Sequence, residues 1–460
     1  MTTGWASAGV ESAVRQFFIP VLFMVCLLEA ILIPPVQAPD ETEHLKRAYL
    51  LSHGYFFLDS PSGKSSGGRV DTGLALYLQK FSELHKSPDV KLSHRFIEEA
   101  SAISWSGQLS YMPAPGTGFY FPLIYSPQAL GLWVGETLGL TVGESCRLAR
   151  LIPMLLSVVL LSAAFKLYSP SIFILSMFFL PMTLFQVSTA GLDGVSLALE
   201  VLTISCFLKS MRPGGETTSD LLSGLNISLF LLASSRVHLL PLLVMPYIVA
   251  HRSGSRRAWV MSVLSSGGVL LWIVVAIKTT VDVRVDVGAP LSTIVGFYLG
   301  HPVAFFKVVY ATLQAPDMLL LYRKSFIGIL GWLDAWLTDI DYNVIGLLVL
   351  ILFFFSLLIA RERTQLPVTI LIILLSILSV GLIFFALLIT WNKHPAVTIA
   401  GVQGRYFISS ALLLGYGVSW GKRVASYWIR MPEIVLFILM ALCSVQAMTV
   451  ALLARYWLVT

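Results

Sequence analysis

Residues Pro34–His44 read Pro-Pro-Val-Gln-Ala-Pro-Asp-Glu-Thr-Glu-His and directly follow the first apolar segment of the chain, residues 17–33. The stretch carries three carboxylates and one imidazole at the end of that segment, on Asp40, Glu41, Glu43 and His44. Only 12% of all residues are charged, so such a cluster needs a physical reason. We therefore take this stretch as the edge of a membrane span and as a candidate site.

The composition of the chain is that of an integral membrane protein. Hydrophobic residues make up 56% of the 460 residues, and the mean hydropathy of +0.81 excludes an ordinary soluble domain. A bilayer core of about 30 Å needs roughly 20 apolar residues per helix, and such runs recur along the chain. We predict an all-α, polytopic membrane domain over residues 1–460, with about eleven spans within a range of roughly 10–13.

The basic residues predict the orientation of the spans. The formal net charge of +6 comes mainly from short loops, a pattern that orients membrane helices and does not favour binding to nucleic acid. Arg15 predicts a cytoplasmic N-terminus. We also place on the cytoplasmic side the basic loops at 209–212, 251–257, 361–363 and 422–430. The external side, in a bacterium the periplasmic side of the inner membrane, then receives a long first loop at 35–118, a second large segment at 279–341, and the neighbourhoods of Asp193, Arg236 and residues 391–404.

Two local patterns predict details of the helices. Three apolar segments, 121–139, 148–166 and 170–187, join two loops that we place outside, so one of them does not cross fully; Pro181 makes the third the candidate for a broken or re-entrant helix. Glycines recur at every fourth residue at Gly131, Gly135 and Gly139. This small-residue face predicts close packing against another helix.

The acidic cluster lies on a predicted short helix over residues 39–53, which Gly54 ends and whose apolar stripe suits the membrane surface. Helical spacing places Asp40 on the same face as Glu43 and His44. The alternative interpretation is structural: Asp40 and Glu41 cap the helix, and Glu43 pairs with Lys46 or Arg47 in water.

Several motifs in this chain resemble a family of bacterial multi-spanning membrane proteins known mainly as a domain of unknown function, usually encoded with surface-polysaccharide genes. The resemblance rests on the Pro34–His44 stretch with Gly54 and on further matches in order along the chain: Tyr125-Ser126-Pro127, Arg150, Pro181-Met182, Ser188 to Asp193, Gly331-Trp332-Leu333-Asp334, and Gln403-Gly404-Arg405-Tyr406-Phe407. Both the family and the predicted topology are similar to the GT-C superfamily, which transfers sugars from polyprenyl-phosphate donors on the external membrane face.

The resemblance implies roles for two acidic positions. In GT-C enzymes an acid just after the first span commonly serves as general base, which here points to Asp40 or Glu41. A second acidic position in the next external loop corresponds to Asp193. This chain lacks the paired Asp-x-Asp or Asp-x-Glu of the oligosaccharyl-transferase branch there, so no cofactor is assigned, and Mg²⁺ or Mn²⁺ stays open.

The chemistry of such a transfer also needs cations for the leaving phosphate. Arg405 beside Tyr406 is our candidate clamp, because a guanidinium matches phosphate bidentately; the alternative is that Arg405 reaches to lipid headgroups. Other candidates for binding the substrate or its phosphate are Glu43, His44, Asp193, Arg236, His238, Lys393 and His394.

Asp334 and Trp332 form a candidate sugar-binding pair. The Asp334 carboxylate would accept a hydrogen bond from a sugar hydroxyl, and the Trp332 indole would cover the apolar face of the sugar ring. For Trp332 the alternative is an aromatic residue of the membrane interface. For Arg236 and His238 it is an ordinary loop between two helices.

The sequence thus predicts a glycosyltransferase of the lipid bilayer. Its donor is a polyprenyl-phosphate-linked sugar, and its acceptor is a cell-surface glycan or a lipid-linked molecule. The alternative is a transporter or flippase for a lipid-linked glycan, which predicts polar residues at mid-membrane depth and two-fold repeats. A non-catalytic scaffold would leave the acidic cluster unexplained.

Overall fold

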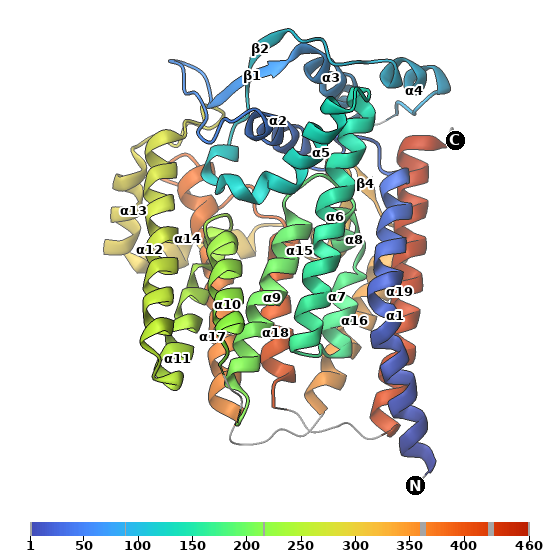
Figure 1. Ribbon diagram of the computed structural model, residues 1–460, viewed down its shortest axis with the longest axis vertical. Helices are drawn as coiled ribbons and strands as arrows, with labels where there is room; N and C mark the ends of the chain where they lie inside the picture. The colour runs from blue at the N-terminus through green and yellow to red at the C-terminus, as the bar shows by residue number, and fades with distance from the viewer. Residues whose placement is uncertain (1, 88, 215–216, 359–364, 422–426, 459–460) are drawn as a thin grey trace.

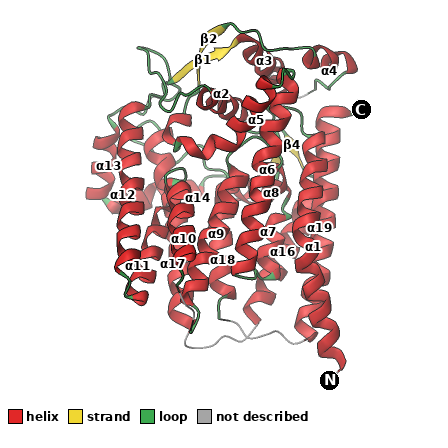
Figure 2. Cartoon of the chain, viewed as in Figure 1, coloured by secondary structure: helices red, strands yellow, loops and turns green. Residues whose placement is uncertain are grey.

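The computed structural model describes the chain except for residues 1, 88, 215–216, 359–364, 422–426 and 459–460. Most of the described chain is helical (Figure 2). The long helices run side by side in one slab, and the first loop covers one end of that slab (Figure 1). The predicted class, a polytopic helical membrane protein, is confirmed.

The α-helices follow one another along nearly the whole chain. In order they are α1 (Thr2–Leu32), α2 (Glu41–Ser52), α3 (Thr72–Lys86), α4 (His94–Ser101), α5 (Ser126–Thr137), α6 (Val142–Leu167), α7 (Ile172–Phe178), α8 (Pro181–Val187), α9 (Asp193–Met211), α10 (Ser219–Ala233), α11 (Val244–Ser253), α12 (Arg256–Thr279), α13 (Leu291–Gly300), α14 (Pro302–Gln314), α15 (Met318–Ile327), α16 (Asp339–Leu358), α17 (Leu366–Trp391), α18 (Phe407–Ser419) and α19 (Tyr427–Leu452).

Shorter elements connect these helices. They are the 3-10 helices η1 (Thr117–Phe119), η2 (Pro122–Tyr125), η3 (Val237–Leu243) and η5 (Gly404–Tyr406), and the π-helical turn η6 (Leu453–Trp457). Two antiparallel strand pairs, which the sequence analysis did not predict, are β1 (Gly67–Asp71) with β2 (Leu109–Pro113), and β3 (Ile329–Leu330) with β4 (Ala335–Trp336). Gly67 lies opposite Pro113 in the first pair.

The number of membrane spans is smaller than predicted when helix length is the criterion. Within the described residues, 7 helices are long and apolar enough to cross a membrane, or up to 8 if α13 and α14, bent by 98° at their junction, form one span. The prediction of about eleven counted apolar runs that fold into short or broken helices, including α5, α10 and the pair α7–α8. An apolar run satisfies a hydropathy criterion whether or not its backbone stays in one straight helix.

The predicted break at Pro181 is confirmed. α7 ends at Phe178 and α8 begins at Pro181, because proline cannot donate a helical hydrogen bond and is tolerated in a first turn. The segment 121–139 does not yield a span either. Its helix α5 has 12 residues, about 18 Å of rise, and it packs on α6 and α2 near the covered end of the slab (Figure 1).

Two of the predicted basic loops lie together in the structure. Arg252 donates to the carbonyls of Met211 and Arg212 at 2.8 and 2.9 Å, so two of the basic loops meet on one face. The termini lie at opposite faces (Figure 1). The basic residues at 361–363 and most of those at 422–430 lie outside the described residues.

The first helix of the first loop, α2, is enclosed rather than spread on the membrane surface as we expected. Glu41 and residues 44–50 are buried, and α2 packs against α5 and β1. Leu45, Ala48 and Tyr49 belong to a second apolar core under the first loop. The strand pair β1–β2 supplies the cover that the sequence did not predict, whereas the predicted stop at Gly54 is confirmed by its φ of 85°.

The predicted glycine face packs closely at two of its three positions. A Cβ on Gly131 would lie 2.5 Å from the Ala149 nitrogen, and one on Gly135 would meet Ser145, both on α6. Gly139 instead follows α5 with a φ of 69° and open space around it. The first two glycines therefore let α5 approach α6.

We expect Gly131→Ala to destabilise the protein, by about 1–3 kcal/mol, because its methyl group must displace the α6 backbone. The matched control is Gly381→Ala in the interior of α17, where a Cβ would meet nothing within 4 Å; helix propensity predicts an unchanged or slightly higher stability there. Thermal unfolding in detergent measures both. Equal midpoints for the two variants would contradict the packing role of Gly131.

Candidate functional site

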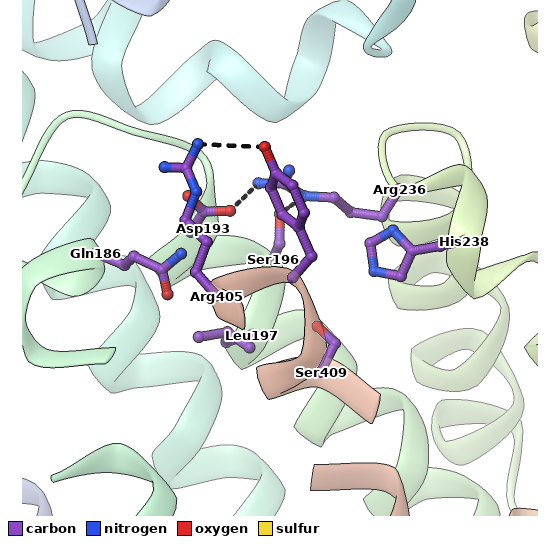
Figure 3. A pocket seen from close by; sticks show the side chains of 9 residues that line it. Gln186, Asp193, Ser196, Leu197, Arg236, His238, Arg405 and Ser409 are labelled. Atoms are coloured by element: carbon purple, nitrogen blue, oxygen red, sulfur yellow. Dashed lines mark hydrogen bonds and ion pairs between the residues drawn. The ribbon is translucent and has the colours of Figure 1, made fainter. Parts of the chain in front are cut away.

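A small polar pocket lies where several helices end under the first loop (Figure 3). It is lined by Gln186 at the end of α8, by the first turn of α9, by residues before and within η3, and by the η5–α18 junction: Gln186, Asp193, Ser196, Leu197, Arg236, His238, Arg405, Tyr406 and Ser409. The pocket thus brings together five residues that the sequence singled out from three separate segments, namely Asp193, Arg236, His238, Arg405 and Tyr406.

Asp193 and Arg236 neutralise each other within the pocket. The Nη2 of Arg236 lies 2.5 Å from Asp193 Oδ1, and its Nε donates to Ser196 Oγ at 3.2 Å. The guanidinium also lies over the Tyr120 ring, 5.8 Å from its centroid. Contacts with Asp193, Ser196 and Tyr120 thus hold the Arg236 guanidinium in place, and the ion pair contributes little net charge to the pocket.

Arg405 is the pocket's guanidinium without an ion pair in the described part of the chain. Its Nη2 donates to the Tyr406 hydroxyl at 3.4 Å, and its Nε is buried with no hydrogen-bond partner among the residues that the structure describes. Within the same residues, the Nε2 of His238 is also buried without a partner. A positive charge and unused hydrogen-bonding groups therefore converge on one cavity, which suits an anionic ligand.

Asp40 is half-buried and sits at the N-cap of α2 in the left-handed conformation, with φ 63° and ψ 2°. It makes no side-chain cap, and no hydrogen bond or ion pair to its carboxylate is found among the described residues. Such backbone strain in a residue other than glycine, combined with an unpaired carboxylate, is typical of functional positions.

Asp40 interacts electrostatically with groups from four segments around it: Glu43, His44, Tyr120, Tyr125, Arg284 and Arg405. Asp40, which has no ion-pair partner among the described residues, therefore lies within electrostatic range of Arg405 in the pocket.

His44 points toward the same region but carries no charge at neutral pH. Burial lowers the pKa of His44 to about 4, the positive charges of Arg236 and Arg405 act in the same direction, and the acids Asp40 and Asp193 oppose them. Its Nδ1 is 3.0 Å from the Tyr125 hydroxyl. His44 can therefore exchange a hydrogen bond with a substrate but does not add a cation for phosphate.

Glu41, the other candidate base, is fully buried and already bonded. Its Oε1 accepts from Arg150 Nε and from the Ala190 backbone N–H, both at 2.9 Å; its Oε2 accepts from Arg150 Nη2 at 3.0 Å and from the Ala38 N–H at 3.3 Å. Arg150 also donates to the carbonyls of Ile33 and Pro34 at 2.7 and 2.8 Å. We call Glu41 and Arg150 the buried pair; its geometry is that of a structural connection.

The predicted pairing of Glu43 with Lys46 is present, at 2.7 Å. Burial raises the pKa of Glu43, against the attraction of Lys46 and Arg284. Lys46 donates onward to the Pro113 carbonyl at 2.5 Å. Glu43 therefore lies beside Asp40 but is engaged in holding α2 against β2.

The remaining predicted residues lie away from the pocket lining. Asp334 pairs with Arg455 at 2.7 Å, and Trp332 donates its Nε1–H to the Val36 carbonyl at 2.9 Å while stacking on His85 at 4.5 Å. Lys393 is exposed. The ring of His394 contacts the Leu388 carbonyl at 3.0 Å and the Tyr298 hydroxyl at 3.5 Å. These side chains are engaged elsewhere in the fold.

Sequence reasoning missed several residues of the site: Gln186, Ser196, Leu197, Ser409, Tyr120 and Arg284. A local signal existed for two of them. Ser196 follows Asp193 by three residues and Ser409 follows Arg405 by four, so each shares a helical face with a predicted residue. The others come into place only through tertiary packing.

The arrangement does not form a recognisable metal site. Among the described residues, no group of three or more His, Cys, Asp and Glu side chains is placed to hold an ion. Asp193 is engaged by Arg236, and Glu41 by Arg150.

Residues 22–414 match the family model DUF2142, described as a predicted membrane protein. The protein belongs to the DUF2142 family. No curated protein matches the chain. The DUF2142 match covers every residue of the pocket lining, together with Asp40 and the buried pair.

The buried pair should be essential for the stability of this DUF2142 protein. Removing one partner from a buried ion pair leaves an uncompensated charge and costs about 3–5 kcal/mol. We therefore expect Arg150→Met to lower the unfolding midpoint in detergent strongly, and Glu41→Gln to do so as well. Glu99→Gln, which breaks an exposed pair with Lys80 on the surface of α4, is the control and should change the midpoint little. Wild-type midpoints in both buried variants would contradict this role.

His44 should make the fold sensitive to acid. Its pKa in the folded protein, about 4, lies below its ordinary value of 6.5, so the unfolded chain binds the proton more readily. The stability that neutral His44 contributes is present above about pH 6.5 and is lost as the pH falls toward 4, about 1–2 kcal/mol by pH 5.

Unfolding midpoints at pH 7 and pH 5 measure this dependence. His44→Gln should lose less stability than the wild type between the two, whereas a variant at exposed His94, His94→Gln, should behave as the wild type. An unchanged pH dependence in His44→Gln would refute the assignment.

Proposed function

We propose that this protein is an inverting membrane glycosyltransferase of the GT-C type, which moves a sugar from a polyprenyl-phosphate donor to a glycan or lipid-linked acceptor on the periplasmic face of a bacterial inner membrane. The observation that carries the proposal is the electrostatic interaction of Asp40 with Arg405, which lines the polar pocket, whereas Asp40 lies outside its lining. Neither side chain has an ion-pair partner among the described residues. The Asp40 carboxylate can take a proton from an acceptor hydroxyl, and the Arg405 guanidinium can bind a phosphate.

The pocket residues would bind the leaving phosphate and stabilise its charge. As the bond between the anomeric carbon and the phosphate oxygen breaks, negative charge grows on the phosphate. Arg405 offers a guanidinium that is not committed to a carboxylate, and Arg236 is held close by Asp193 and Ser196. The side chains of Gln186, Ser196 and Ser409 add hydrogen-bonding capacity.

Asp40 would act as the general base for the attacking hydroxyl of the acceptor. The acceptor oxygen forms a bond to the anomeric carbon while its proton passes to the Asp40 carboxylate, and the polyprenyl phosphate departs with the electron pair of the broken bond. Asp40 is the stronger candidate of the two predicted bases because both oxygens of Glu41 are already bonded and the side chain is fully buried.

The position of the pocket supports a lipid-linked donor. Its lining comes from helix ends and junctions, as the close-up in Figure 3 shows. Arg236 of the lining lies over the ring of Tyr120, which lies just after the first loop. A polyprenyl phosphate would keep its tail in the bilayer and present its phosphate at this level, while an acceptor would approach from the loop side. The periplasmic orientation rests on the basic loops of the opposite face.

The alternative of a transporter or flippase is favoured by one separate observation. Glu200 on α9 is fully buried. Among the described residues, neither of its carboxylate oxygens has a partner of ordinary hydrogen-bond geometry, although the Ser409 side chain interacts with this carboxylate. Acids within a membrane domain commonly mark transport or proton pathways. A flipping assay in liposomes with a fluorescent polyprenyl-phosphate lipid distinguishes this function from sugar transfer, because transfer needs Asp40 and flipping by this route needs Glu200.

Asp40→Asn should reduce sugar transfer by about a hundredfold or more, because the amide cannot accept the proton. The assay supplies undecaprenyl phosphate carrying radiolabelled glucose, mannose or galactose to membranes that contain the host glycan, at matched expression. Arg405→Ala should also lose about a hundredfold by removing a donor to the leaving phosphate, with partial recovery in Arg405→Lys.

The matched control is Asp317→Asn. Asp317 is also an aspartate at a helix N-cap, with φ 61° and no side-chain cap, but it is exposed at the start of α15. Asparagine tolerates this backbone conformation, so the control separates loss of the carboxylate from a change in the turn. Full activity of Asp40→Asn would rule out Asp40 as the base.

A further inference from the structure

The turn that carries Arg405 rests directly on α15. Arg405 is the middle residue of η5, and its side chain lies in the pocket (Figure 3). Gly404, the residue before it, is buried against the backbone of α15. A Cβ on Gly404 would collide with the Tyr322 carbonyl oxygen and with the Phe326 nitrogen. The turn and the helix are therefore in backbone contact, which only glycine permits at this position.

A buried hydroxyl on α15 holds the same turn by a hydrogen bond. The Gly404 N–H donates to Ser325 Oγ at 2.7 Å. The Ser325 hydroxyl donates its own proton to the Leu321 carbonyl, one turn back along α15, at 2.6 Å. Ser325 is only 1% exposed. Its oxygen is thus oriented by its own helix and accepts from the turn that carries Arg405.

The loop before η5 is held in the same way at two further backbone donors. Residues 392–403 link α17 to η5. The Ile399 N–H donates to Thr312 Oγ1 on α14 at 2.9 Å, and the Ala400 N–H donates to Asn392 Oδ1 at 2.8 Å. The Thr312 hydroxyl also donates to a carbonyl one turn back along its own helix, at 2.7 Å. Side-chain oxygens therefore supply the acceptors that a helix or a sheet would otherwise provide.

Arg405 depends on this backbone for its place in the pocket. Among the described residues its guanidinium has no ion pair, and its side-chain hydrogen bond goes to the hydroxyl of Tyr406 on the same turn, at 3.4 Å. Arg236, the other arginine of the pocket, is instead fixed by an ion pair from another segment. The hydrogen bond from the turn to Ser325 therefore sets where the Arg405 guanidinium meets a ligand.

We propose that Ser325 is a positioning residue, which holds Arg405 at the place where it binds the phosphate of a lipid-linked donor. The inference rests on the proposed function. It gives α15, which lies outside the pocket lining, a role in ligand binding through the turn that it supports.

A double-mutant cycle on binding tests the proposal without turnover. The probe is the methyl ester of undecaprenyl phosphate, a phosphodiester of constant charge, and native mass spectrometry of the detergent-solubilised full-length protein measures the fraction bound. Ser325→Ala removes the acceptor of the Gly404 N–H and should weaken binding about tenfold. In the Arg405→Ala background the same change should weaken binding by less than about twofold, because the side chain through which Ser325 acts is then absent.

The matched control is Thr312→Val. It removes the same kind of hydrogen bond, from the N–H of Ile399, six residues before Arg405 in the chain. It should lower the unfolding midpoint about as much as Ser325→Ala does, because each change leaves one buried N–H without its acceptor. Its affinity for the probe should stay within about twofold of the wild type, which separates positioning of Arg405 from a general loss of stability.

Two further arms sharpen the test. Undecaprenol, which has the same tail but no phosphate, should bind equally to the wild type and to every variant. Ser325→Cys keeps nearly the size of the side chain while its sulfur accepts only weakly, so its loss of affinity for the probe should be intermediate. This variant keeps the proposal testable if Ser325→Ala does not fold.

The outcomes separate the inference from the proposed function. A coupled loss of probe binding, together with no sugar transfer by the wild type, would overturn the glycosyltransferase function and leave the role of Ser325 standing. Equal affinities of Ser325→Ala and the wild type, or the same loss in the Arg405→Ala background, would overturn the role of Ser325 and leave the proposed function intact. Failure of the wild type to bind the probe would also overturn the inference, because Arg405 would then hold no lipid phosphate.

Discussion

The buried pair of Glu41 and Arg150 is the interaction on which the rest of the site depends. Two charges withdrawn from solvent are tolerated only when their hydrogen-bonding groups are satisfied, and here they bind the end of α1, the start of α2 and the Ala190 backbone to α6. Asp40 lies one residue before Glu41, and Asp193 lies three residues after Ala190. A single contact therefore fixes both segments that supply the acids of the site.

The charges of the site are arranged so that some cancel and some do not. Asp193 and Arg236 form a pair, whereas neither Asp40 nor Arg405 has an ion-pair partner among the described residues. In a partly desolvated pocket an unpaired charge acts more strongly than one in water. One of these two groups, Asp40, also has a strained backbone with a positive φ.

Sequence and structure agree best where composition and local spacing decide the outcome. The apolar runs predict the helical membrane class, and Pro181 predicts the break between α7 and α8. Two of the predicted basic loops meet where Arg252 binds the carbonyls of Met211 and Arg212. Sequence and structure disagree where an apolar run is short or bent, as in α5 and at the junction of α13 and α14. The β1–β2 pair carries no strong strand pattern, so its cover over α2 was not predicted.

The sequence by itself determined the candidates for a functional site, because charged side chains are rare in this chain and Asp40, Asp193, Arg236 and Arg405 lie beside long apolar runs. Only the tertiary structure decided which of these side chains have ion-pair partners among the described residues. Glu41 and Arg150 are 109 residues apart, Asp193 and Arg236 43, and Asp334 and Arg455 121. Local spacing reports neighbours within a few turns of one helix. It cannot distinguish Asp40, whose carboxylate is unpaired, from the adjacent Glu41, whose carboxylate is fully bonded by distant segments.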